Sequence, residues 1–216
     1  MALKTLTYKP QEGLSADWRL IALHGWGANS ADLLGLAPSL DLPDFAMVFP
    51  EAPLPHPQVP GGRMWYSFPL GYDFEQAYDF EPQSDLQTSR QALRSWLLDL
   101  AESSSIPLER TVLAGFSQGG AMALDVGLGL PLAAQVSLSG YLHGAVSAAV
   151  TPRPLIMVHG SFDPVVPIAK AYAAKAELEH QGQVVRFHEL PMGHEVSPAV
   201  IGLLRQFCED LRQGTR

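Results

Sequence analysis

A serine flanked by glycines is the residue of this sequence best suited to covalent chemistry. Gly115-Phe116-Ser117-Gln118-Gly119 has the pattern G-x-S-x-G, with the apolar run Thr111–Ala114 before it and the small-residue segment Gly119–Leu124 after it. This context predicts a sharp strand-to-helix turn that lifts the serine hydroxyl above a sheet, at the positive end of a helix. We therefore predict that Ser117 is a nucleophile for acyl transfer. The alternative is a serine that only caps a helix.

A serine hydroxyl needs a nearby base, and the base needs an acid that orients it. His194 is the best base, because it follows the strand candidate Val184–Leu190 and precedes the last helix. It should then lie at the edge of a parallel sheet where active sites collect. His24 and His159 end strands before glycines, where structural hydrogen bonds are the simpler interpretation. The other histidines have structural positions: we expect His56 in a Pro-rich loop, His143 in a surface turn, His180 at a helix end and His188 in a strand.

Asp163 is the best acid, because it lies in the loop after the buried strand candidate Leu155–Val158. Its carboxylate would hold the imidazole in the correct tautomer and stabilise the positive form. The order serine, aspartate, histidine along the chain is also the order of hydrolases with this turn. Three other acids compete with Asp163. Asp125 lies inside the helix after Ser117, Glu189 at the end of a strand, and Glu195 next to His194. Asp163 has a plainer alternative role as the cap of the next helical turn.

Acyl transfer also needs N–H groups that bind the developing oxyanion. One donor is expected from Gln118, the residue after the nucleophile. The second should come from the loop after an early strand, and Leu23-His24-Gly25-Trp26-Gly27 fits that position. We predict the backbone N–H of Trp26, with Gly25 and Gly27 as lesser candidates. The indole of Trp26 can fill an apolar site at the same time.

Short apolar runs alternate with helical patterns, which predicts an α/β fold with a mostly parallel sheet covered by helices on both faces. Strands are predicted at 19–23, 45–49, 111–114, 134–138, 155–158 and 184–190, with an antiparallel edge strand at 3–8. Ser84–Gln87 has the form of a capping box at the start of a helix. Further helices are predicted at Ile168–Glu179, which Gly182 terminates, and from Ser197-Pro198 onward.

The segment from about residue 50 to residue 83 interrupts this alternation. It is rich in proline and in aromatic residues, namely Trp65, Tyr66, Phe68, Tyr72, Phe74, Tyr78 and Phe80. Long connections are usually functional or disordered, and so many aromatic residues argue against disorder. We therefore predict one domain over 1–216 in which this segment forms a pocket wall or a lid.

Composition limits the class of protein. The 216 residues carry a formal net charge of −8, which argues against nucleic acid or an anionic membrane as the partner. Cys208 is the one cysteine, so no internal disulfide forms and a cytoplasmic location is expected. No uninterrupted apolar run reaches the roughly 18 residues of a membrane span, and the start of the chain lacks a cleavage signal. Cys208 itself is expected in the core.

Four segments together resemble the phospholipase/carboxylesterase family of α/β-hydrolases, which includes the acyl-protein thioesterases. They are L-H-G-W-G at 23–27, G-F-S-Q-G-G-A at 115–121, H-G-S-F-D-P-V-V-P at 159–167 and M-G-H-E-V-S at 192–197. The resemblance implies the α/β-hydrolase fold and hydrolysis of carboxylic esters or thioesters without a metal or cofactor. It assigns the triad to Ser117, Asp163 and His194 and the oxyanion site to Trp26 and Gln118, as the residues themselves do.

The resemblance also places the substrate pocket. W-Y-S at 65–67 is similar to a tryptophan-containing segment that lines the family's acyl site, so Trp65 and Tyr66 are predicted pocket residues, with Phe68 and the Trp26 side chain. The thioesterases usually carry a short aliphatic residue in place of Trp26 and an aspartate in place of Ala28. The aromatic stretch around 72–80 is also unlike the corresponding part of their sequences. Trp26 is therefore expected to narrow the acyl pocket.

Three interpretations stay open beside an esterase for small or medium acyl groups. A lysophospholipase or an acyl-protein thioesterase would use the same chemistry. A non-catalytic binding module would keep the fold, but it should have lost a triad residue, and this sequence has all three in order. The aromatic segment could also mediate self-association, so a homodimer is compatible with each interpretation.

Overall fold

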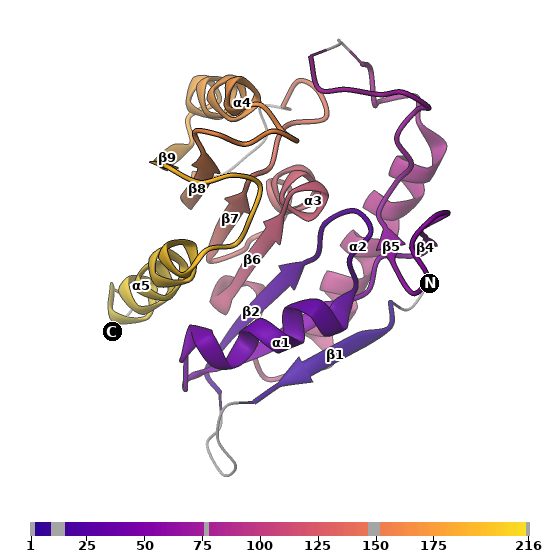
Figure 1. Cartoon of the computed structure of the whole chain (residues 1–216). Helices are drawn as coiled ribbons and strands as arrows, with labels where there is room; N and C mark the ends of the chain where they lie inside the picture. Colours follow the sequence, from indigo (N-terminus) through magenta and orange to yellow (C-terminus); the bar gives the residue numbers. More distant parts are fainter. Residues whose placement is uncertain (1–2, 10–15, 76–77, 147–151, 215–216) are drawn as a thin grey trace.

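The chain forms a seven-stranded sheet with helices on both sides (Figure 1). The computed structural model describes residues 3–9, 16–75, 78–146 and 152–214. The strand order is β1-β3-β2-β6-β7-β8-β9, where β1 pairs antiparallel with β3 and the remaining pairs are parallel. The predicted sheet and its antiparallel edge strand are confirmed. The strands are β1 (Thr5–Tyr8), β2 (Trp18–Leu23), β3 (Phe45–Pro50), β6 (Thr111–Phe116), β7 (Ala134–Leu138), β8 (Pro154–Gly160) and β9 (Val184–Leu190).

Alternate residues of the central strands supply two separate cores, because successive strand side chains point to opposite faces. Leu20 of β2 packs in a cluster with α1 and α5, whereas Ile21 packs with α2 and α3. A smaller cluster joins β8 to α4 on the same side as α3. The helices are α1 (Ser30–Leu40), α2 (Ser84–Glu102), α3 (Gln118–Gly127), α4 (Ile168–His180) and α5 (Pro198–Gly214), with a short 3-10 helix at Leu108–Arg110.

Helix α1 was not predicted from the sequence. Pro38 lies inside it, and a proline removes one helical hydrogen bond and normally argues against a helix interior. Its start is nevertheless well defined, because the Asn29 side chain accepts hydrogen bonds from the N–H groups of Ala31 and Asp32. The Asp32 carboxylate accepts in return from the N–H of Asn29 at 2.9 Å, which completes a capping box.

The capping box predicted at Ser84–Gln87 is wrong. Ser84 is already the first helical residue of α2, and Gln83 occupies the cap position without a side-chain cap bond. The next residue, Asp85, bonds to a residue outside the helix: its carboxylate accepts a hydrogen bond from the N–H of Ser67 at 2.8 Å. The start of α2 is therefore attached to the aromatic segment.

A two-stranded hairpin, β4 (Leu54–Pro55) with β5 (Arg63–Met64), begins the long segment before α2. Gly27 N–H donates to Arg63 O at 2.9 Å, and Arg63 N–H donates to Ala28 O at 2.8 Å. The hairpin is thus paired with the loop that follows β2. Within the described part of the chain, no helix is long and apolar enough to cross a membrane.

The core around β2 should dominate stability. Leu20 has no exposed surface, so Leu20→Ala should lower the free energy of unfolding by about 2–5 kcal/mol through lost burial and a residual cavity. Urea unfolding followed by circular dichroism measures this change. Leu70→Ala is the matched control, because Leu70 is fully exposed and its truncation should leave the midpoint almost unchanged. Equal effects of both substitutions would contradict the assignment of the core.

Candidate active site

The turn between β6 and α3 holds Ser117 in a strained conformation. Its φ is 54° and its ψ is −118°, outside the regions that residues with side chains normally adopt. A Cβ on Gly115 would lie 2.1 Å from the carbonyl oxygen of Gly119, and a Cβ on Gly119 would lie 2.3 Å from that of Leu23. Both positions therefore require glycine, and the pattern G-x-S-x-G forms the sharp turn that the sequence predicted.

Neighbouring strands hold this turn in place. The N–H of Ser117 donates to the carbonyl of Leu138, at the end of β7, at 2.8 Å. Gly25, in the loop after β2, approaches so closely that a Cβ there would lie 3.4 Å from the Cβ of Ser117. The serine is thus surrounded by the carboxyl ends of β2, β6 and β7, as expected for a site in a parallel sheet.

Asp163 and His194 form a hydrogen-bonded pair at the ends of β8 and β9. Asp163 Oδ2 lies 2.7 Å from His194 Nδ1, and the Asp163 side chain has no exposed surface. Its other oxygen accepts hydrogen bonds from the N–H groups of Val165 and Val166, each at 2.9 Å. Burial opposes ionisation of the carboxyl, but the bonds from His194, Val166 and Val165 outweigh burial and lower the pKa of Asp163. The carboxylate is therefore charged and fixed, with one oxygen toward the imidazole.

The loop that carries His194 packs tightly on the end of β8. A Cβ on Gly160 would lie 2.3 Å from the carbonyl oxygen of Met192. The His194 ring also contacts the ring of Phe116, the residue before the serine, with 4.8 Å between centroids. The hydrogen bonds of the described residues include none between Ser117 Oγ and His194. Such bonds are often long in the absence of substrate and shorten when it binds.

The two other histidines at this sheet edge have structural partners, in line with their interpretation from the sequence. His24 Nε2 accepts from the N–H of Ala52 at 3.1 Å, so its Nδ1 donates to the carbonyl of Gly25 at 2.8 Å. His159 Nε2 lies 2.8 Å from the carbonyl oxygen of Val166. Burial lowers the pKa of both imidazoles, which favours the neutral form. For His24 the hydrogen bonds also require that form, because its Nε2 accepts.

The two predicted oxyanion donors flank the serine. Trp26 follows Gly25, which abuts Ser117, and Gln118 begins α3 directly after it. In the described part of the chain, the backbone N–H of Trp26 has no hydrogen-bond acceptor, nor does that of Gln118. Unpaired N–H groups at a helix start and in a glycine loop are typical of an anion site.

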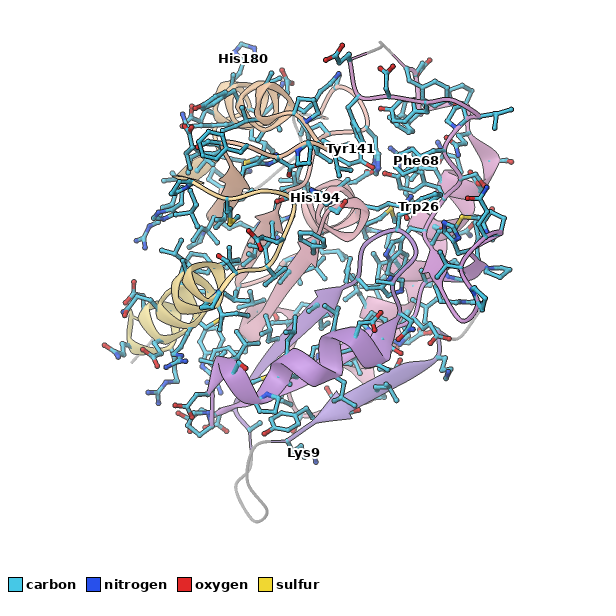
Figure 2. All side chains as sticks on the ribbon, viewed as in Figure 1. Lys9, Trp26, Phe68, Tyr141, His180 and His194 are labelled. Carbon is cyan, nitrogen blue, oxygen red and sulfur yellow. The ribbon has the colours of Figure 1, made fainter. Side chains whose placement is uncertain are left out.

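The four predicted pocket residues separate into two pairs. Trp26 is 43% exposed and contacts the half-buried Phe68 with ring centroids 5.8 Å apart, so both can meet a ligand. Trp65 and Tyr66 have no exposed surface, which corrects the prediction that they line the pocket. Their polar groups bind the interior instead, and Trp65 Nε1 donates to the carbonyl of His24 at 3.0 Å. In the view of Figure 2, the labels of Trp26, Phe68, Tyr141 and His194 lie in the upper central part of the molecule.

The side chain of Gln118 has a role that the sequence did not reveal. Its Oε1 accepts from the N–H of Trp65, and its Nε2 donates to the carbonyl of Tyr66, each at 2.8 Å. The amide therefore fixes the aromatic segment to the residue beside the nucleophile. The motif G-F-S-Q-G contained the glutamine, but no pattern in the sequence indicated its partners.

His143 is also corrected, because it lies in a buried network and not in a surface turn. Its Nδ1 lies 2.6 Å from the carboxylate of Asp125, and its Nε2 lies 2.8 Å from the hydroxyl of Tyr66. The Tyr66 hydroxyl bonds in turn to that of Tyr141. Arg90 donates to Asp125 at 2.6 Å and so joins α2 to α3. Through Tyr66, this buried network anchors the aromatic segment to α2 and α3.

The rest of the aromatic segment packs as a cluster of rings beside α4. Phe68 and Tyr72 stack with centroids 5.1 Å apart, and Phe74 contacts Tyr141 at 4.7 Å. A groove of about 300 Å³ lies between the rings and α4, and Lys170 of α4 is one of the residues that line it. The described residues include no group of three His, Cys, Asp or Glu side chains arranged for a metal ion.

Comparison with known proteins places the chain in a family. The phospholipase/carboxylesterase family matches residues 12–211. An acyl-protein thioesterase 1 from Mycosarcoma maydis is 30% identical over 96% of each chain, and one from Neurospora crassa is 32% identical over 87% of this chain and 81% of its own length. The crystal structure of esterase PE8 superposes with a TM-score of 0.87 at 27% identity, over 98% of this chain and 100% of the other. The chain therefore belongs to the phospholipase/carboxylesterase family of α/β-hydrolases.

Loss of the Asp163 charge should disable the histidine. Asp163→Asn keeps an oxygen for the N–H groups of Val165 and Val166, so the fold should persist. The amide favours the wrong imidazole tautomer, and kcat for an aryl ester should fall by about 10⁴-fold. Glu195→Gln, beside His194 but exposed, is the matched control and should retain kcat within about twofold. A loss in the control as large as that in Asp163→Asn would contradict the pairing.

Proposed function

We propose that this protein hydrolyses carboxylic esters or thioesters through an acyl-enzyme on Ser117. The observation that carries the proposal is the convergence of three groups at one sheet edge. These groups are the strained Ser117, the buried Asp163 paired with the partly exposed His194, and the unpaired N–H groups of Trp26 and Gln118. Together they provide a nucleophile, a base with its orienting acid, and an oxyanion site, which acyl transfer requires.

The first half of the reaction forms the acyl-enzyme. His194 Nε2 takes the hydroxyl proton as Ser117 Oγ attacks the acyl carbon, and the carbonyl oxygen becomes an oxyanion. Asp163 accepts a hydrogen bond from Nδ1–H and so stabilises the imidazolium. The bond to the leaving oxygen or sulfur then breaks, and His194 returns its proton to the departing alcohol or thiol.

Water completes the cycle by the same route in reverse. His194 removes a proton from water, the oxygen attacks the acyl carbon, and the second tetrahedral intermediate expels Ser117 Oγ with that proton. The products are the carboxylic acid and free enzyme. In both halves the N–H groups of Trp26 and Gln118 donate to the oxyanion, and removal of one such donor typically costs about 10²–10³ in kcat.

We propose small or medium neutral acyl groups as substrates. Trp26 and Phe68 present partly exposed aromatic surface beside the serine, which favours apolar groups of limited length. The relatives named acyl-protein thioesterase make a thioester of an acylated protein the second candidate, and a lysophospholipid is a third. A non-catalytic binding module is disfavoured, because every group of the proposed machinery is present. The cytoplasm is the proposed location, supported by the single cysteine of the sequence.

Replacement of the nucleophile tests the proposal. Ser117→Ala should lower kcat for an aryl acetate by about 10⁶-fold, because it removes the hydroxyl that accepts the acyl group. Initial rates with purified protein measure the loss. Ser105→Ala is the control, because Ser105 is an exposed serine in the loop after α2 and its loss should leave kcat unchanged. If Ser117→Ala retains more than about a thousandth of wild-type kcat, Ser117 is not the nucleophile.

The indole of Trp26 should set the preferred acyl length. Wild type should prefer short aryl esters, and Trp26→Ala should raise kcat/KM for octanoyl relative to acetyl esters by about tenfold. The backbone N–H remains in this variant, so acetyl hydrolysis should persist. Tyr172→Ala removes an exposed ring on α4 and should not alter the profile. A wild type that already prefers long chains would exclude a narrowed pocket.

A further inference from the structure

His56 closes the turn that joins the hairpin strands β4 and β5. Its Nδ1 accepts hydrogen bonds from the N–H of Gln58 at 3.1 Å and from that of Val59 at 2.9 Å. The backbone N–H of His56 donates to the carbonyl of Gly62 at 2.9 Å, and the backbone N–H of Gly62 donates to the carbonyl of Val59 at 2.9 Å. The turn over 56–62 is thus closed by one imidazole and two backbone bonds, and it has little freedom to shift.

This turn packs directly on the backbone of the loop proposed to bind the oxyanion. A Cβ on Gly62 would lie only 2.5 Å from the carbonyl oxygen of Gly27, and a Cβ on Gly27 would lie 3.7 Å from Cδ2 of His56. The N–H of Gly27 donates to the carbonyl of Arg63 on the same hairpin, and the carbonyl of Ala28 accepts from the N–H of Arg63. A movement of the hairpin must therefore move the peptide units on either side of Gly27.

The imidazole of His56 also packs on the indole of Trp26. The ring centroids are 4.0 Å apart with an interplanar angle of 72°, an edge-to-face contact. Because Nδ1 is an acceptor, the proton of the neutral ring lies on Nε2. Nε2 is buried, and within the described residues it has no hydrogen-bond partner. A buried N–H without a partner is costly, so this ring orientation must be held by its other contacts.

We propose that His56 is a positioning residue for the oxyanion donor at Trp26. Its Nδ1 fixes the turn that supports the Trp26–Gly27 backbone, and its ring supports the indole of Trp26. His56 acts through Trp26 and does not touch the reacting atoms. The inference rests on the proposed function, because the N–H of Trp26 matters only if an oxyanion forms beside Ser117.

Three substitutions test this role. His56→Ala removes both the acceptor and the ring. His56→Asn keeps an acceptor, because an asparagine oxygen can bind the N–H groups two and three residues ahead, but it lacks the ring. Gln58→Ala is the matched control, since it truncates an exposed side chain of the same turn. The measurements are kcat and KM for an aryl acetate, the inhibition constant of a trifluoromethyl ketone that forms a tetrahedral adduct, and the thermal midpoint.

His56→Ala should lower kcat by about 10–100-fold, with KM within about twofold of wild type. The loss is smaller than on removal of an oxyanion donor, because the N–H of Trp26 is displaced but still present. The inhibition constant should rise by a similar factor, because the adduct resembles the transition state. His56→Asn should recover part of the loss, and Gln58→Ala should match wild type. If His56→Ala does not fold, His56→Asn decides, with at least about a threefold loss in kcat expected.

The inference is overturned if the His56 variants match Gln58→Ala in kcat, or if the inhibition constant stays unchanged while kcat falls with the thermal midpoint. The second result would mean a purely structural histidine. Failure of the proposed function gives a different result, since wild type itself would then neither hydrolyse the ester nor bind the ketone at Ser117. That outcome removes the oxyanion and overturns the inference as well.

Discussion

Close contact between backbones at the turn around Ser117 is the constraint on which the site depends. The carbonyl of Gly119 lies where any Cβ at position 115 would clash, and Leu23 O lies where a Cβ at position 119 would clash. Only glycines allow β6 to enter α3 so sharply beside β2. The same closeness places Gly25 against Ser117, and it brings a nucleophile, a helix start and a glycine loop together without any long side chain. The cost is a strained φ at Ser117, which the neighbouring strands hold.

Two buried supports hold the groups around that turn. On one side, Asp163 is held by two backbone N–H groups and presents one oxygen to His194. On the other, the aromatic segment is attached to α3 by the amide of Gln118 and to the network of Asp125 and His143 by the Tyr66 hydroxyl. Each support consists of buried or partly buried polar groups that are hydrogen-bonded to one another, and such networks favour one arrangement over others. The expected result is a preorganised site whose partly exposed aromatic surface comes from Trp26 and Phe68.

Local patterns in the sequence were sufficient to predict the parallel sheet, the sharp turn at Ser117 and the pairing of Asp163 with His194. Strand ends in a parallel sheet meet at one edge, so a motif at the end of a strand is placed once the strand is recognised. Helix α1 was missed because Pro38 contradicts helical propensity, which the capping box at Asn29 and packing on the sheet override. The buried network of His143 and the support that His56 gives to Trp26 join segments far apart in the chain. No periodicity or spacing specifies such partners, so these contacts required the structure.

The central claim is that the hydroxyl of Ser117 receives the acyl group. A fluorophosphonate probe reacts with an activated serine and remains attached, so peptide mass spectrometry of the labelled protein tests the claim most directly. The structure predicts one adduct per chain, on the peptide that contains Ser117, and no label after Ser117→Ala. An active preparation that stays unlabelled, or that carries its label on another residue, would contradict the account.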